Sequence, residues 1–277
     1  MTPTDTSPIE SVVYLVGFAP RGALTGFTST GLEPEQAARV EPLGTFDAII
    51  IYVPATMFIG DDADARLQDV TWLSPRAARH ESILQEAAAR APIMPIGFGS
   101  VFTSSDRIAE TLAEHADDIT EFFATSADCD EWSIKAWVDR DAAIAQARAS
   151  IARERTNTGG GAAYLRARRM DDEAERFAED HALALVDDLL DQIDPCIVDA
   201  VERRVVEADE DSGRWTIAHV ALLIHRDVRA AFDSTLDEAA ALLDAEGIHL
   251  ELSGPWAPYS FCPQLGSTDD DTDTDDA

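Results

Sequence analysis

The sequence predicts an α+β protein of two domains followed by an acidic tail. Three observations lead to this prediction. Short apolar runs that suit strands are interspersed with segments in which apolar residues recur every three or four positions, as in helices. The order strand, strand, helix, strand occurs in both halves of the chain. A chain of 277 residues is long enough for one large core or two ordinary ones.

The first domain is predicted over residues 12–127, after a flexible N-terminus of residues 1–11 that is polar and rich in Thr and Pro. Val12–Phe18 is an apolar run typical of a buried strand. Residues 19–37 hold Gly, Pro and Thr without a clear period. If the domain is ferredoxin-like, this stretch supplies the first crossover, as an irregular loop or a short helix.

The remaining elements of this domain follow the ferredoxin-like order. Residues 38–41 and 46–53 suit a hairpin. Ser74 and Pro75 are typical of a helix N-cap followed by proline at the first helical position. One stripe of this helix is expected to be buried: His80, Ile83, Leu84, Ala87 and Ala88. Pro92–Phe102 then indicates an apolar connector strand, whose prolines suit the edge of a sheet.

A second amphipathic helix is expected near the domain boundary, which we place between residues 103 and 130. Thr103–Asp106 matches a capping box at its start. One face then repeats at helical spacing: Ile108, Leu112, His115, Ile119 and Phe122.

The second domain is predicted over residues 128–262 as an antiparallel sheet with one long helix. Residues 131–138 alternate as a strand does, with Trp132, Ile134, Ala136 and Val138 on one face. Residues 163–193 form one amphipathic pattern, ~45 Å long if helical. Its expected buried stripe is Ala174, Phe177, His181, Leu185 and Leu189.

Three further strands are expected over residues 197–206, 215–225 and 248–252. The middle one is apolar on both faces and so suits the centre of the sheet. Ser234–Asp237 matches the capping box of a helix that ends at Gly247.

The charge of the chain limits its possible partners. There are 21 basic residues against 53 acidic ones, a net charge of -32, and Lys135 is the single lysine. Such acidity argues against nucleic-acid and membrane binding, which need basic patches. Carboxylates ~10 Å apart repel by ~0.4 kcal/mol per pair in water, and molar salt screens this repulsion. We therefore expect a protein of a halophilic cytoplasm; a metal-buffering or polycation-binding role is the alternative.

The tail of residues 263–277 is expected to be disordered, since six of the nine residues from Asp269 to Ala277 are Asp. Three cysteines without close spacing predict neither a disulfide framework nor a zinc site: Cys129, Cys196 and Cys262. A secretion signal and an apolar run of ~18 residues are both lacking, so we expect an intracellular protein outside the membrane.

No catalytic or cofactor motif stands out, so an enzyme is not expected and no cofactor or metal is predicted. Gly159–Gly161 lacks the Lys and Ser/Thr of a phosphate loop and suits a hinge. The histidines at 80, 115 and 181 lie on apolar helix stripes, where hydrogen-bonded core residues are common. One arginine cluster has two open interpretations, a face for an acidic partner or pairing with acids one turn on: Arg153, Arg155, Arg166, Arg168 and Arg169.

Four stretches together resemble one family: Pro92–Phe102, Glu131–Lys135, Gly161–Leu165 and Gly254–Phe261. The family is that of the gas vesicle GvpL/GvpF accessory proteins, and the acidity suggests the haloarchaeal type. The signature residues, which we take as candidate interaction residues, are Pro95, Phe98, Gly99, Trp132, Lys135, Tyr164, Leu165, Gly254, Pro255, Trp256, Pro258, Tyr259 and Phe261. The chain departs from the family pattern at Gly97, where many members carry a basic residue.

The resemblance implies a non-catalytic cytoplasmic protein with a modified ferredoxin-like first domain. Its implied partners are the hydrophobic gas vesicle shell protein and other gas vesicle accessory proteins. We expect the shell subunit to dock on the first domain, around Val12–Phe18 and Pro92–Phe102, and the arginines at 166–169 are the alternative site. Trp256 is expected to pack into the second domain. The alternative function is a ferredoxin-like regulatory or small-molecule-binding protein.

Overall fold

The computed structural model describes residues 10–154, 163–203 and 213–265. Within the long helix α6 (Ala163–Ile193) it describes side chains from residue 171 on. The hinge predicted at Gly159–Gly161, and the acidic residues from Asp269 on, lie outside these residues.

The chain forms two compact units. The first joins the residues up to Ala127 with those from Ala257 on, and the second runs from Asp128 to Trp256. The residues after Trp256 were expected to close the second domain. They pack with the first unit instead, because Tyr259 and Phe261 bury their rings against its cores.

The first unit is built on a six-stranded sheet with the strand order β2-β3-β4-β1-β5. Its strands are β1 (Ser11–Pro20), β2 (Thr28–Thr30), β3 (Ala37–Leu43), β4 (Phe46–Pro54), β5 (Met94–Pro95) and β6 (Val101–Phe102). β1 pairs with β4 on one side and with both β5 and β6 on the other, always antiparallel. The stretch expected to supply a crossover forms turns and the short strand β2 in place of a helix.

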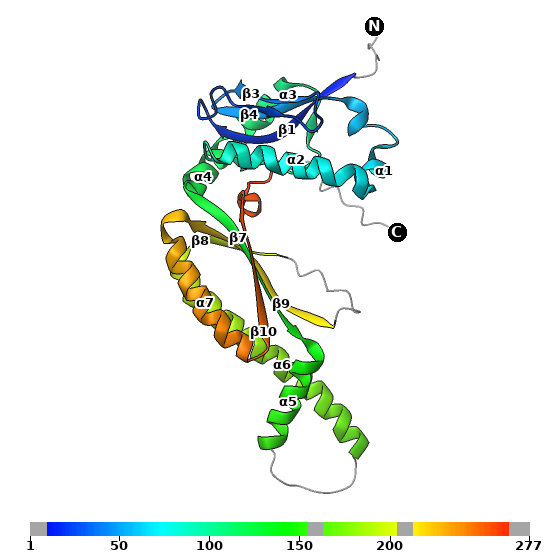
Figure 1. Ribbon diagram of the computed structural model, residues 1–277, viewed down its shortest axis with the longest axis vertical. Helices are drawn as coiled ribbons and strands as arrows, with labels where there is room; N and C mark the ends of the chain where they lie inside the picture. Colours follow the sequence, from blue (N-terminus) through cyan, green and yellow to red (C-terminus); the bar gives the residue numbers. More distant parts are fainter. Residues whose placement is uncertain (1–9, 155–162, 204–212, 266–277) are drawn as a thin grey trace. The chain divides into compact units, whose positions relative to one another are not determined.

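Helices cover both faces of this sheet: α1 (Ala63–Gln68), α2 (Val70–Ala88), α3 (Ser105–Glu114) and α4 (Ala116–Ser126). Figure 1 shows α2 running along one face. There Tyr14 and Val16 of β1 pack with Ile83 and Leu84 of α2. The alternate residues of β1, such as Leu15, face a second core that α3 and α4 complete. β1 is therefore buried on both faces, as its unbroken apolar run predicts.

The start predicted for α2 is wrong. The helix begins at Val70, where the Asp69 carboxylate accepts a hydrogen bond from the backbone N–H of Thr71 at 2.9 Å. Pro75 consequently lies inside the helix, where its missing N–H removes one backbone hydrogen bond. The expected stripe is buried except at Ala88, which is exposed.

The next helix is broken in two. His115 ends α3 with φ -112° and ψ 20°, outside the helical region, and α4 follows directly. The N-cap is Ser104, whose hydroxyl accepts from the N–H of Arg107 at 3.4 Å. The capping group is thus one residue later than the predicted box, although the buried stripe at Ile108, Leu112 and Ile119 is confirmed.

The second unit has a four-stranded antiparallel sheet in the order β10-β7-β9-β8. Its strands are β7 (Cys129–Asp139), β8 (Ile197–Glu202), β9 (Arg214–His225) and β10 (Ile248–Trp256). Its helices are α5 (Arg140–Glu154), α6, and α7 (Arg229–Ala245), with the short turns η2 (Asp194–Cys196) and η4 (Arg226–Val228). β9 lies between β7 and β8, so the prediction of a central strand is confirmed.

α6 and α7 pack on one face of this sheet and enclose its core. The bounds predicted for α6 are confirmed. Its buried stripe agrees with the predicted one at Ala174 and Leu189 and differs elsewhere: Ala174, Ala178, Ala182, Val186, Leu189 and Ile193. Phe177 and His181 are exposed, because the face that meets α5 and the sheet is turned by about one residue from the predicted one. α7 begins at Arg229, so Ser234 is an interior residue and not its cap. Gly247 has φ +80° and follows the last turn, as predicted for its end.

Candidate functional site

The C-terminal signature segment contacts the first unit beside α2. The turn η5 (Tyr259–Phe261) follows the buried Pro258. The Tyr259 hydroxyl lies 3.4 Å from Nε2 of His80 and 3.3 Å from the carboxylate of Glu81. Two parts of the signature thus meet, because Phe98 packs in T-shaped contact with the same histidine ring.

His80 is also bound from the other side. Its Nδ1 lies 2.8 Å from the hydroxyl of Tyr14, which in turn accepts from the N–H of Gly99 at 3.4 Å. All of these contacts are satisfied by a neutral imidazole that accepts from Tyr14 at Nδ1 and donates to Tyr259 at Nε2. Tyr259 then donates to Glu81.

Burial controls the ionisation of this cluster. It lowers the pKa of His80 to about 4, and the backbone of Ile96 opposes this shift only in part. Burial also raises the pKa of Tyr14 and of Tyr259, the latter helped by the charge of Glu81. All three side chains are therefore uncharged at neutral pH. The cluster fits a hydrogen-bonded brace that holds the C-terminal segment, and the prediction of a core histidine at position 80 is confirmed.

The rest of the C-terminal signature packs differently. Gly254 lies against the ring of Trp132, where an added Cβ would come within 2.8 Å of a ring carbon. The guanidinium of Arg229 lies over the same ring, 3.3 Å from its centroid. Trp256 is 42 % exposed. The expectation that it is buried in the second domain is wrong, because β10 continues to this residue at the edge of the sheet.

Lys135 lies on the sheet face that points away from the helix-covered core. Its register partners are His219 on β9 and Glu251 on β10. The hydroxyl of Ser133 is 3.0 Å from Nε2 of His219. Burial, and then the charges of Arg203 and Lys135, lower the pKa of His219. This pair has the composition of a nucleophile and base, but Ser133 is only 4 % exposed and so does not present its hydroxyl to a substrate.

Tyr164, Leu165 and the arginines at 166, 168 and 169 belong to the first turns of α6. Their side chains lie outside the described residues. His181, expected in a core, is exposed, with Nε2 3.6 Å from the carboxylate of Glu246.

The expectation that Val12–Phe18 offers a docking surface on the first domain is wrong. Both edges of β1 are paired and both its faces are covered, so the strand offers nothing to a partner. At the neighbouring edge, Met94 and Pro95 are buried. The carbonyl of Pro95 accepts from Sγ of Cys262 at 3.4 Å. The chain's own C-terminal segment therefore occupies this part of the edge.

Two further findings concern metal ions and membranes. Across residues 10–154, 163–203 and 213–265, no group of three or more His, Cys, Asp or Glu is arranged to hold a metal ion. Within the same ranges, every helix is too short or too polar to cross a bilayer.

Comparison with known proteins identifies the family. The model of the family described as gas vesicle synthesis protein GvpL/GvpF matches residues 12–263. The chain belongs to the GvpL/GvpF family. The family model thus covers both compact units and the braced segment at Tyr259.

Individual GvpL/GvpF proteins are similar over most of their length. Gas vesicle protein L of a Streptomyces species is 26 % identical over 247 residues, 88 % of each chain. Gas vesicle protein L1 of Halobacterium salinarum is 24 % identical, over 86 % of this chain and 85 % of its own. A Streptomyces gas vesicle protein F is 23 % identical. Relatives of both the L and the F type are therefore similar to this chain.

The fold is that of a solved gas vesicle protein. The crystal structure of GvpF from Anabaena superposes with a TM-score of 0.70 at 17 % identity, covering 92 % of this chain and 99 % of that one. GvpF from Microcystis aeruginosa gives a TM-score of 0.67. The mixed helical and antiparallel architecture of this chain is thus the GvpF fold.

Proposed function

We propose that this protein is an accessory protein of gas vesicle assembly that binds the hydrophobic shell protein and other gas vesicle accessory proteins. The observation that carries the proposal is the match of the family model to residues 12–263. Because that match spans nearly the whole described chain, the proposal concerns both units.

The physical chemistry of the chain supports such a role. A subunit of a gas-facing wall is apolar before it assembles, and exposed apolar surface aggregates in water. A partner with a net charge of -32 keeps the complex dispersed while its own apolar groups cover the subunit. Among the described residues, three exposed large apolar side chains lie on the first unit and five on the second: Phe177, Leu183, Val198, Leu242 and Trp256. We propose this unit, in place of β1, as the side that receives the shell subunit.

The proposal includes a cytoplasmic location, a haloarchaeal type and action by binding without catalysis. The neutral, doubly hydrogen-bonded His80 and the buried Ser133 support a non-catalytic role. The strand order of the first sheet supports a modified ferredoxin-like unit, in which turns and β2 replace the first crossover helix.

The experiment uses a gas-vesicle-forming host from which the gene is deleted. We expect no vesicles by electron microscopy, with recovery when the full chain is supplied. Tagged full chain, purified in molar KCl, should bring down the shell protein, since apolar burial does not depend on Coulomb attraction. Normal vesicles in the deletion strain together with no capture of shell protein would overturn the proposal. In that case the small-molecule-binding alternative would take its place.

A further inference from the structure

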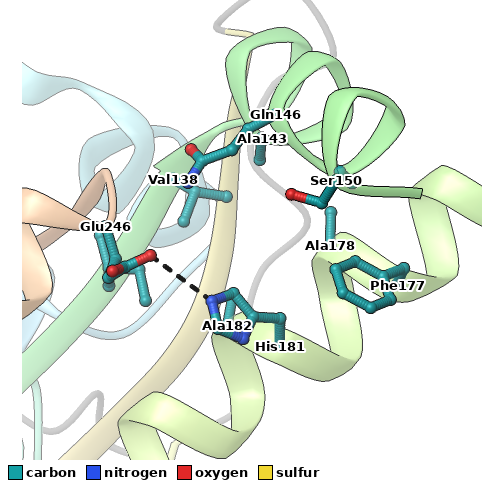
Figure 2. Close-up of a pocket in the computed structure, with 11 residues that line it drawn as sticks. Val138, Ala143, Gln146, Ser150, Phe177, Ala178, His181, Ala182 and Glu246 are labelled. Carbon is teal, nitrogen blue, oxygen red and sulfur yellow. Dashed lines mark ion pairs between the residues drawn. The ribbon is translucent and has the colours of Figure 1, made fainter. Parts of the chain in front are cut away.

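A pocket of about 270 Å³ opens in the second unit where α5 and α6 leave the sheet (Figure 2). Its floor is formed by Val138 of β7 and Ile248 of β10, and alanines of α5 and α6 form its walls. Three of these alanines are buried: Ala147, Ala178 and Ala182. Because a methyl group is all that each contributes, the helices pack closely but leave an apolar space between them and the strands.

Larger and more polar side chains surround the mouth of the pocket. Phe177 is 43 % exposed, and its ring stacks on His181 at 6.2 Å between centroids. His181 reaches across to Glu246 at the end of α7, as the dashed line in Figure 2 marks. An exposed aromatic ring at the mouth of an apolar pocket is typical of a binding surface, because burying it on complex formation is favourable.

The surroundings of the mouth are acidic. A second hollow shares Phe177 with the pocket, and its other lining residues are three carboxylates and one guanidinium: Asp172, Glu173, Arg176 and Asp180. Glu246 adds a carboxylate on the opposite side. The nearby Arg140 and Arg148 of α5 form ion pairs with Glu175 and Asp171. An incoming cation therefore meets more negative than positive charge here.

We propose that this pocket binds a large apolar side chain of a partner protein segment that also carries arginine or lysine. The apolar walls select the anchor, and the carboxylates around the mouth select the flanking cations. The connection between α5 and α6 cannot supply the anchor, because Arg155–Ala162 contains no apolar side chain larger than alanine. The inference goes beyond the proposed function, since it concerns the chemistry that this pocket accepts from whichever protein presents it.

The test uses three capped tripeptides as probes of the full chain, Arg-Trp-Arg, Glu-Trp-Glu and Arg-Ala-Arg, together with free indole. Binding is followed by NMR of alanine methyl groups, at the lowest KCl concentration that keeps the chain folded. We expect Arg-Trp-Arg to shift the methyls of Ala178 and Ala182 and to bind roughly threefold to tenfold more tightly than Glu-Trp-Glu. Molar KCl should reduce this preference while the apolar contact persists.

Variants distinguish binding in the pocket from general attraction of a basic peptide to an acidic chain. Ala178→Leu fills the pocket and should abolish the methyl shifts, whereas Ala184→Leu, at an exposed position of the same helix, should leave them unchanged. If Ala178→Leu does not fold, Glu246→Lys tests the charge at an exposed residue. It should remove much of the preference for the basic peptide.

Four results would overturn the proposal. The first is the absence of any shift at Ala178 and Ala182. The second is equal binding of the basic and acidic tryptophan peptides. The third is equal binding of Arg-Ala-Arg, which would indicate general charge attraction. The fourth is free indole binding as tightly as the basic peptide, which would indicate a small-molecule pocket. If Ala178→Leu changes the oligomeric state of the protein, the segment that occupies the pocket comes from a second copy of the chain. None of these results bears on the gas vesicle assay, so the two proposals fail independently.

Discussion

The hydroxyl of Tyr259 lies 3.4 Å from Nε2 of His80, although 179 positions separate the two residues along the chain. With Tyr14 bound to the other ring nitrogen, the histidine connects the first strand, α2 and the C-terminal segment. The first unit therefore contains both ends of the described chain, and the second unit is inserted between them.

Removing the hydroxyl of Tyr259 should destabilise the first unit. In Tyr259→Phe, His80 and Glu81 each lose a partner, and a buried unsatisfied group costs about 1–3 kcal/mol. The measurement is urea unfolding at fixed KCl concentration. Tyr52→Phe is the matched control, because that hydroxyl is exposed and should cost less than ~0.5 kcal/mol. Equal losses in both variants would show that the contact at His80 contributes nothing.

Stability should fall with acid because of His80. Its pKa is about 4 in the folded chain, below the ordinary value of 6.5 for histidine, so the unfolded state binds more protons between these values. The contribution of neutral His80 to the free energy of unfolding is therefore fully present above pH ~6.5. It is lost as the pH falls towards ~4, which lowers the free energy of unfolding by up to about 3 kcal/mol.

The measurement for His80 is the free energy of unfolding against pH, compared with His80→Gln. The carboxylates titrate in both proteins, so only the difference reports on the histidine. The variant should be less stable at neutral pH but show a shallower decline between pH ~6.5 and ~4. Parallel curves would place the ionisation of His80 outside this window.

Gly254 should not tolerate a side chain. An added Cβ would lie 2.8 Å from the Trp132 ring and 2.9 Å from the carbonyl of Glu131, and φ is +138°. We expect Gly254→Ala to cost about 1–3 kcal/mol in an unfolding titration. At Gly97 nothing lies within 4 Å of an added Cβ, so Gly97→Ala should stay within ~0.5 kcal/mol. A smaller loss at Gly254 than at Gly97 would contradict the packing against Trp132.

Trp256→Ala should cost less than about 2 kcal/mol, since much of the ring already meets water. Phe232→Ala, which empties a fully buried position of α7, should cost ~3–5 kcal/mol and serves as the reference. Should the two variants lose equal stability, the exposure of Trp256 would be refuted. The same two proteins can be compared for capture of the shell protein, where loss with Trp256→Ala alone would mark a docking residue.

The acidity of the chain predicts a dependence of folding on salt. With a net charge of -32, repulsion among carboxylates opposes the compact state at low ionic strength. We expect a cooperative unfolding transition in molar KCl and loss of near-ultraviolet circular dichroism in dilute buffer. Identical spectra under both conditions would contradict a halophilic protein.

The sequence by itself determined most of the strands, the long helix and the family. These predictions rested on local signals, because the spacing of apolar residues indicates whether one face or both faces of an element are buried. The signals were the apolar run of Val12–Phe18, the helical period of α6 and the apolar pattern of β9. The strand β2 was not predicted, and Pro92–Phe102 forms the two short strands β5 and β6 where one connector strand was expected. Predicted helix N-caps were less reliable. Ser74 and Ser234 lie inside helices that begin about five residues earlier, since packing extended each helix past its local signal.

Only the tertiary structure decided which residues meet. No periodicity relates Tyr259 to His80, or Ser133 to His219, because these contacts depend on strand order and on the path of the chain after β10. The exposure of Phe177, His181 and Trp256 was missed for the same reason. An apolar or aromatic residue indicates that burial is favourable, but the neighbouring elements decide whether anything covers it.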